Sequence, residues 1–283
     1  MRMLLTLLIF LSLIPQAHAK TLFVLGDSMV DSGNMKILTL GILPYNPLGR
    51  FSDHKNYADY VAERHQITLT PTVLKPGNNY AVAGATATGN VNSVWLNASK
   101  TTGFDDQVKA IIQDDNVHPE HVYLINIGTN DLLGIAYQAH KAYIKTQTSS
   151  RTLIEDKIDP VVKQITEQLK QLQNAGAKQL IIANIAPFYL LPRIHNNLQH
   201  VKNKSMMTAE ANHISTYFNT QLLSALKKQQ IQYTLTDIHQ IYRQHVNEEG
   251  RLIATQEKAF IDDLHPSAAL HRIIAKYIQL PLN

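Results

Sequence analysis

Cysteine is absent from the 283-residue chain, and this absence excludes several classes of chemistry. No disulfide can form, and neither a thiolate nucleophile nor a thiolate metal ligand is available. Stability must therefore come from a conventional hydrophobic core. The hydrophobic share of 45% is ordinary for a globular protein and is sufficient for one α/β domain.

Basic clusters and long apolar runs are also scarce. The densest basic clusters are pairs such as Lys227-Lys228, although the chain carries a formal net charge of +4. Without a basic run interleaved with aromatic residues, nucleic-acid binding is disfavoured. Either a transient contact with an anionic lipid surface or an ordinary solvated face accounts for the positive charge.

The first 19 residues have the pattern of a secretory signal peptide. Arg2 supplies the positive start, residues 4–14 the apolar middle, and Ala17-His18-Ala19 a cleavage site of small residues. An uncleaved anchor is the alternative, but the apolar segment is short for a membrane span of about 20 residues. We expect cleavage near Ala19, export to the periplasm or medium, and a single monomeric domain over residues 20–283.

Apolar runs alternate with helical patterns along the rest of the chain, and this alternation predicts a doubly wound, three-layer α/β/α sandwich around a five-stranded parallel sheet. The expected strands are residues 22–25, 67–69, 121–127, 178–185 and 231–238. The expected helices are residues 56–65, 104–115, 152–174 (with an interruption at Pro160), 208–229, and a last one that opens at Pro266 and ends at Ile278. Residues 75–102 are expected to form a long loop, in which Trp95 either covers an acyl group or fills a surface hollow. Residues 132–148 and 188–207 are candidate walls of a substrate pocket.

The first predicted strand ends abruptly at Gly26-Asp27-Ser28. Ligands of open α/β sheets bind at the carboxyl ends of the strands, so Ser28 has the position of a nucleophile. An ordinary turn rich in Asp and Ser is the competing interpretation.

Phe260 to Ser267, near the other end of the chain, contains an acid and an imidazole. A serine hydroxyl needs a base in hydrogen-bond reach and a carboxylate that holds the base in one tautomer. His265 can be that base, and Asp262, three residues earlier, can return on one turn to face the same ring. Asp263 should point elsewhere.

Gly26-Asp27-Ser28-Met29 resembles the nucleophile motif of the GDSL (SGNH) hydrolase family, with Met29 in place of the usual leucine. Asn79-Tyr80-Ala81-Val82-Ala83-Gly84-Ala85 and Gly128-Thr129-Asn130-Asp131 resemble the family's glycine and asparagine segments, in the family's order. The resemblance implies a flavodoxin-like fold with strand order 2-1-3-4-5. It also implies the catalytic residues Ser28, Asp262 and His265, and an oxyanion hole made by Ser28, Gly84 and Asn130. Judged on its residues alone, Gly84 fits a flexible loop, and Asn130 could cap a helix.

Pro44-Tyr45 and Gly49-Arg50-Phe51-Ser52 resemble the secreted bacterial branch of phospholipases A, lysophospholipases and glycerophospholipid acyltransferases. This resemblance implies a serine esterase that acts on lipid or lysophospholipid esters, with acyl transfer to an alcohol as a further activity and with no metal or cofactor. The alternatives are a broad short-chain carboxylesterase, a polysaccharide deacetylase, or a non-catalytic surface binding protein. The spacing of His195, His200 and His213 indicates surface or packing histidines rather than metal ligands.

Overall fold

The computed structural model describes residues 20–42, 46–73, 76–91, 102–146, 148–198 and 203–281. The predicted signal peptide, Pro44-Tyr45, Trp95 and His200 lie outside these ranges. In chain order the elements are β1 (Leu22–Gly26), α1 (Asn34–Leu38), α2 (Tyr57–Arg64), α3 (Phe104–Gln113), β2 (Val122–Asn126), α4 (Thr129–Thr146), α5 (Arg151–Asn174), β3 (Gln179–Ala183), η1 (Phe188–Leu190), α6 (Pro192–Leu198), α7 (Lys204–Lys228), β4 (Thr234–Thr236), α8 (Ile238–His245) and α9 (Ala268–Lys276).

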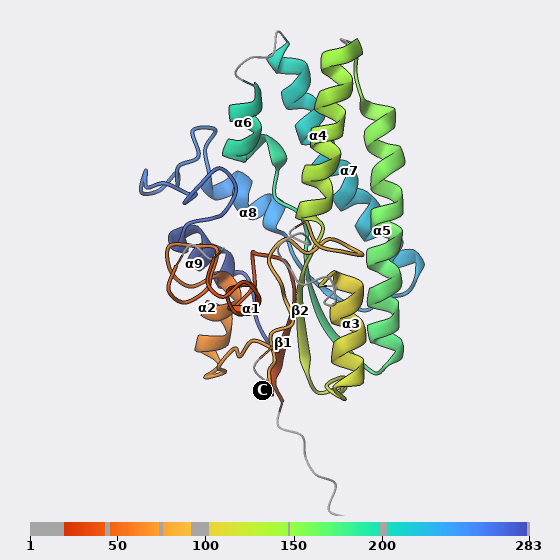
Figure 1. The fold of residues 1–283 in the computed structure, drawn as a ribbon, viewed down its shortest axis with the longest axis vertical. Coiled ribbons are helices and arrows are strands. Elements are labelled where there is room, and N and C mark those ends of the chain that lie inside the picture. The colour runs from red at the N-terminus through yellow and green to blue at the C-terminus, as the bar shows by residue number, and fades with distance from the viewer. Residues whose placement is uncertain are drawn as a thin grey trace, which may run out of the picture.

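The strands form one parallel sheet in the order β1-β2-β3-β4. All residues of β1 and β2 are buried, as the branched and aromatic side chains of a strand covered on both faces require. Helices α2 and α9 lie on one side of the sheet, and α3 and α5 lie on the other (Figure 1). These layers confirm the predicted α/β class with a parallel sheet between helices.

The prediction of five strands was wrong, because the described residues form four. Residues 67–69 do not form a strand, and the place beside β1 is taken by residues 78–82. The Val24 N–H donates to the Asn78 carbonyl (2.9 Å), and the Val24 carbonyl accepts from the Tyr80 N–H (2.7 Å). Only one isolated bridge, between Val24 and Asn79, results. One bridge is too little pairing for a strand, although the segment occupies the second strand's expected position.

Two prolines behave differently from their predicted roles. Helix α5 continues through Pro160, which is exposed, so that water can satisfy the carbonyl that loses its helical partner. Pro266 does not open the last helix, because Ser267 is its N-cap and accepts from the Leu270 N–H at 3.4 Å. Helix α8 has no counterpart among the predicted elements.

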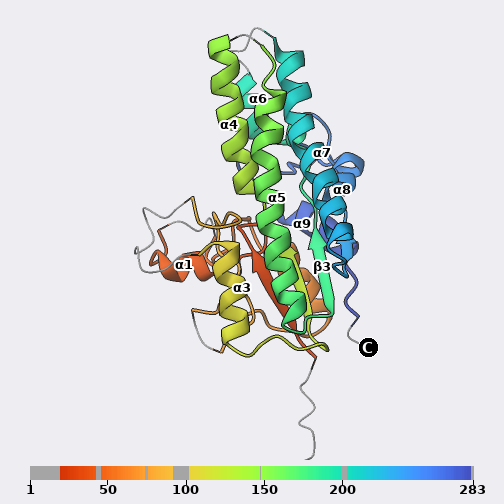
Figure 2. The same ribbon diagram turned by 90° about the vertical axis from the view of Figure 1, so that its right-hand side faces the viewer.

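Helices α4, α5 and α7 project past the carboxyl ends of the strands, as Figure 2 shows from the side. Helix α4 begins at Thr129, three residues after the end of β2, and its 18 residues span about 27 Å. The sheet edge that carries Ser28 therefore lies at the foot of a helical extension. Within the described residues, no helix is both long and apolar enough to span a membrane.

Candidate active site

Ser28 follows the end of β1 through a turn that only glycine permits. Gly26 has φ +145°, and a Cβ built on it would lie 2.0 Å from the Asn126 carbonyl oxygen of the neighbouring strand. The Gly26 backbone also pairs with the Gln107 amide, which accepts from its N–H (2.7 Å) and donates to its carbonyl (2.9 Å). After this point the N–H groups of Val30 and Asp31 donate to the Asp27 carbonyl. Ser28 is thus held at the sheet edge with 8% of its surface exposed.

His265 approaches Ser28 from the loop that precedes α9. Its Nε2 lies 3.1 Å from the Ser28 Oγ, and its Nδ1 lies 2.8 Å from Oδ2 of Asp262. With the Nδ1 proton donated to the carboxylate, Nε2 is the nitrogen that accepts from the serine hydroxyl. The structure therefore brings together the three side chains that the sequence proposed as catalytic.

Asp262 is organised by its own loop. The backbone N–H groups of Leu264 (2.7 Å) and His265 (2.6 Å) both donate to its Oδ1. Burial raises the pKa of this carboxyl, but the hydrogen bonds from the His265 ring and from the two N–H groups outweigh burial, and the pKa falls well below its usual value. Asp262 is therefore ionised at neutral pH and can stabilise a protonated imidazole.

Asp263 points away from the imidazole, as predicted. Its carboxylate accepts two hydrogen bonds from the Arg193 guanidinium (2.7 and 3.1 Å), and its carbonyl accepts from the Arg193 N–H (2.7 Å). These contacts attach the start of α6 to the loop that carries His265.

The loop around Gly84 is fixed from several sides. Gly84 has φ +82° and lies in a turn closed by the Ala85 N–H, which donates to the Val82 carbonyl. Asn130 donates from Nδ2 to the Ala85 carbonyl (2.9 Å), and Asn90 donates to the Ala83 carbonyl (3.0 Å). Asn130 is therefore held through one N–H of its amide, and the second N–H of that amide is left for another acceptor.

Ser28, Asn130 and His265 line one small cavity of about 30 Å³ at the carboxyl ends of the strands. Met29 lies in its wall and packs against the core, so the departure from leucine is accommodated. The other lining side chains are largely apolar and include Phe188, Leu191 and Tyr242. Gly84 is not in this wall, but the next residue, Ala85, accepts the hydrogen bond from Asn130, which does line the cavity.

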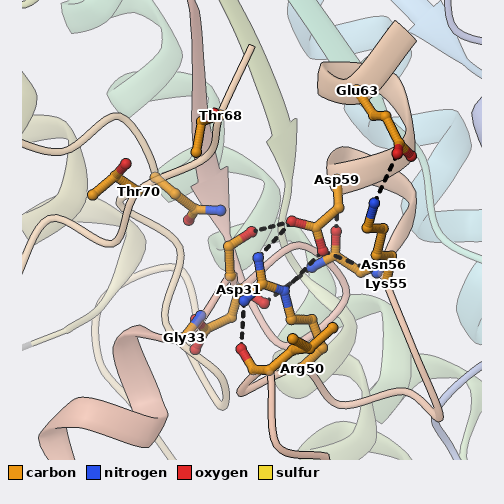
Figure 3. Close-up of polar contacts among 12 residues, drawn as sticks. Asp31, Gly33, Arg50, Lys55, Asn56, Asp59, Glu63, Thr68 and Thr70 are labelled. Carbon is orange, nitrogen blue, oxygen red and sulfur yellow. Dashed lines mark hydrogen bonds and ion pairs between the residues drawn. The ribbon is translucent and has the colours of Figure 1, made fainter. Parts of the chain in front are cut away.

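A polar network that sequence reasoning missed supports the loop after Ser28 (Figure 3). Asp59 accepts two hydrogen bonds from the Arg50 guanidinium (2.7 and 2.9 Å) and one from the Ser32 hydroxyl (3.1 Å). The Asn56 amide donates to the Asp31 carbonyl (3.0 Å). In the sequence, Asp31 and its neighbours form a polar stretch that is typical of a turn. This polar stretch is the signal in the sequence that could have indicated the network. Its partners Arg50, Asn56 and Asp59 lie too far along the chain to be predicted from spacing.

Two buried carboxyls next to this network have raised pKa values. Burial raises the pKa of Asp27 to about 7, and the nearby Asp131 and Asp31 carboxyls add to the effect, while the Met29 N–H opposes it. Burial raises the pKa of Asp31 to about 6, against four backbone N–H donors that favour its charged form. These side chains accept hydrogen bonds from backbone N–H groups and so support the backbone around Ser28.

Within the described ranges, no group of three His, Asp or Glu side chains is arranged to hold a metal ion. His213 pairs with Glu155 at 2.8 Å, which fits its interpretation as a packing histidine.

Comparison with known proteins gives a family-level match. The model of the family described as "GDSL-like Lipase/Acylhydrolase" matches residues 22–278. GDSL esterase/lipase 7 of Arabidopsis thaliana is 29% identical over 242 residues, which cover 73% of this chain and 64% of that protein. "Inactive GDSL esterase/lipase-like protein 25" of the same plant is 27% identical over 232 residues, which cover 74% of this chain and 51% of that protein. The chain thus spans between about half and two thirds of the length of these relatives. Among solved structures, an extracellular lipase from Streptomyces rimosus aligns over 92% of this chain and 100% of its own with a TM-score of 0.49 and 13% identity.

Proposed function

The chain belongs to the GDSL-like lipase and acylhydrolase family, and from this premise we propose that it hydrolyses carboxylic esters through an acyl-enzyme formed on Ser28. The observation that carries the proposal is the continuous hydrogen-bonded chain from the Ser28 hydroxyl through His265 to Asp262, with distances of 3.1 and 2.8 Å. A serine alone is a poor nucleophile at neutral pH, and this arrangement supplies the base that it needs.

In the proposed first step, the Ser28 Oγ attacks the ester carbonyl carbon while its proton passes to Nε2 of His265. Asp262 stabilises the imidazolium without taking the proton. The tetrahedral intermediate collapses, the bond to the alcohol oxygen breaks, and Nε2 gives its proton to that oxygen. Water then attacks the acyl-serine with His265 again as base, and the acid leaves as the Ser28 hydroxyl is restored.

The negative oxygen of the intermediate needs hydrogen-bond donors. Among the residues that the structure describes, the backbone N–H groups of Ser28 and Gly84 donate to no other protein group. Asn130 has one amide N–H beyond the one bound to Ala85. These three donors form the proposed oxyanion hole, and each contributes about 10²- to 10³-fold in rate in enzymes of this kind.

For the substrate, we propose a lipid ester such as a lysophospholipid or phospholipid. The apolar wall of the cavity, with Phe188 and Leu191, supports an acyl group that avoids water. The same acyl-serine would acylate an alcohol if the alcohol replaced water in the second step. Export of the protein after cleavage near Ala19 belongs to the same proposal, and N-terminal sequencing of protein recovered outside the cytoplasm tests it.

A short-chain esterase or polysaccharide deacetylase is the second candidate, and the size of the cavity favours it. A volume of about 30 Å³ is small beside the roughly 300–1,000 Å³ of typical ligand pockets, and it suits a short acyl group better than a long chain beside Ser28. A lysophospholipid, a diacyl phospholipid, acetylated xylan and p-nitrophenyl esters of short and long acids should therefore be compared, each with and without an added alcohol. Preference for acetyl groups across this panel would favour the second candidate.

Some relatives carry names that mark them as inactive, so catalysis itself requires a test. We expect the Ser28→Ala variant to lose ester hydrolysis by a factor of about 10⁴ or more, with an unchanged circular dichroism spectrum and unchanged melting temperature. Covalent labelling of the wild type by a fluorophosphonate, read by mass spectrometry, should map to Ser28. A wild type that is folded but neither labelled nor active on any ester would point instead to a non-catalytic binding protein.

A further inference from the structure

A second cavity, separate from the one around Ser28, is lined by residues of α4, α6 and α7. These three helices belong to the helical extension (Figure 2). Its volume is about 250 Å³, several times that of the cavity that contains Ser28. Most of its wall is apolar, with Leu133 and Ala136 from α4, Ile194 from α6, and Met207, Ala211 and Ile214 from α7.

The two charged side chains in the wall are already bound by the protein. Arg193 is paired with the Asp263 carboxylate, and Oε1 of Glu210 accepts a hydrogen bond from the Ser150 N–H (2.6 Å), while Oε2 of Glu210 is buried with no partner among the described residues. Arg193 is therefore not placed as the main binding partner of an anionic ligand. The apolar walls favour an aliphatic occupant, because each methylene that enters leaves water.

The two cavities share no lining residue, but residues that line one are neighbours of residues that line the other at three places. On α4, Thr129 and Asn130 line the cavity of Ser28, and Leu133 and Ala136 line the larger one. These positions are three or four residues apart and so lie on one face of the helix. Leu191 faces the first cavity and Ile194 the second, and the Ile194 N–H donates to the Leu191 carbonyl. The Arg193 pair with Asp263 ties the second wall to the loop of His265.

We propose that the cavity between α4, α6 and α7 binds the aliphatic acyl chain of the ester whose carbonyl lies at Ser28. The inference rests on the proposed function and extends it, because it gives a binding site to a long acyl chain, which the cavity of Ser28 is too small to hold. An acyl group attached at Ser28 follows the face of α4 from Asn130 past Leu133 to Ala136. The distance along α4 from Asn130 to His140, at the far end of the cavity wall, is about 15 Å.

A chain-length series tests the inference. In the wild type, kcat/KM should rise from p-nitrophenyl acetate through butyrate to octanoate, by about fourfold for each methylene that enters the cavity. Ala136→Phe places a ring in the cavity and should lower kcat/KM for octanoate at least about 30-fold, while acetate stays within about threefold. Ile144→Phe is the matched control, since Ile144 lies on the same helix, is 58% exposed and is absent from the cavity wall. Equal losses on acetate and octanoate, or none on either, would overturn the inference.

A binding measurement covers the case in which Ala136→Phe folds poorly. In a Ser28→Ala background, octanoate and a fluorescent fatty acid should bind, and Ile214→Ala, which enlarges the cavity, should shift the preferred chain toward longer acids. Ala136→Phe should weaken binding of the fluorescent acid at least about tenfold where its circular dichroism matches that of the parent. If neither variant changes the affinity for the fluorescent acid or the preferred length of the acid, the acyl chain binds outside this cavity. Failure of the proposed function has a different signature, because the wild type would then lack activity on acetate as well.

Discussion

The Asp31 carboxylate accepts a hydrogen bond from the backbone N–H of Ala83, which is 2.9 Å away in space and 52 residues away in sequence. The same carboxylate accepts from the N–H groups of Gly33 and Asn34 (both 2.7 Å) and of Met35 (3.1 Å). Asp31 therefore joins the loop that follows Ser28 to the loop that contains Gly84. Asp31 helps to set the spacing between two of the proposed oxyanion donors, together with Asn34, whose amide donates to the Asn79 and Ala81 carbonyls.

Asp31→Asn should disturb this spacing. In the native protein Oδ1 accepts from Gly33 and Asn34, and Oδ2 accepts from Met35 and Ala83. An asparagine offers one acceptor oxygen, so its amino group must face two of these N–H groups. A buried donor without an acceptor costs about 1–3 kcal/mol, and we expect kcat to fall about 10- to 100-fold with KM changed less than about threefold. Steady-state kinetics measures both values. Asp115→Asn, at an exposed position of a distant turn, is the control, and equal kinetics in the two variants would contradict the role of Asp31.

Asp262→Asn and Asp263→Asn form a matched pair of neighbouring carboxyls. Asp262 contacts Nδ1 of His265, whereas Asp263 contacts Arg193. Asparagine at position 262 can donate to Nδ1 and so favour the tautomer with its proton on Nε2, which cannot accept the proton of Ser28. We expect kcat to fall by about 10³- to 10⁴-fold for Asp262→Asn and by less than about tenfold for Asp263→Asn. Similar losses in the two variants would show that general disturbance of the loop dominates.

Asn130→Ala and Asn90→Ala separate an oxyanion donor from a support of the same loop. Both amides donate to carbonyls of residues 83–85, but only Asn130 lines the cavity of Ser28. Removing one oxyanion donor typically costs about 10²- to 10³-fold in kcat, so Asn130→Ala should show a loss of that size. Asn90→Ala should lower the melting temperature and reduce kcat by less than about tenfold. A kcat for Asn130→Ala that matches the Asn90→Ala value would remove Asn130 from the proposed oxyanion hole.

The contact of Ser28 with His265 could be predicted from the sequence because both residues stand in short motifs at the ends of recognisable elements. The spacing of Asp262 and His265 has a local meaning, since three residues suffice for a turn that brings the two side chains together. Gly26 predicted the sharp turn before Ser28, and the apolar run before Gly26 predicted a buried strand. Residues close together in the sequence determine these features.

The features that could not be predicted depend on partners far along the chain. The pairing of residues 78–82 with β1, in place of residues 67–69, depends on contacts between segments that are far apart in the sequence. Helix α5 passes Pro160 because that position faces solvent, and a proline in sequence does not reveal which side it faces. The hydrogen bond that orients the Asn130 amide depends on the position of the Ala85 carbonyl, 45 residues earlier in the sequence. The cavity between α4, α6 and α7 needs three helices whose relative placement no spacing encodes.

His271 should make the stability of the protein sensitive to acid. The ring is fully buried on α9, its Nδ1 accepts from the Tyr57 N–H (3.2 Å), and burial lowers its pKa to about 3. The unfolded chain binds a proton at this residue below about pH 6.5, so between the two values the folded state holds fewer protons. The stability that the neutral His271 ring gives the folded protein is therefore fully present above about pH 6.5. As the pH falls toward 3, the free energy of unfolding decreases by up to about 1.4 kcal/mol per pH unit. His271→Asn keeps an acceptor for Tyr57 but cannot titrate. We expect this variant to be less stable than the wild type at pH 7. Between pH 7 and pH 5, the difference in the free energy of unfolding should shift by about 2 kcal/mol in favour of the variant. Urea unfolding at both pH values measures this difference, and a difference that stays constant would mean that the ring takes up its proton without unfolding.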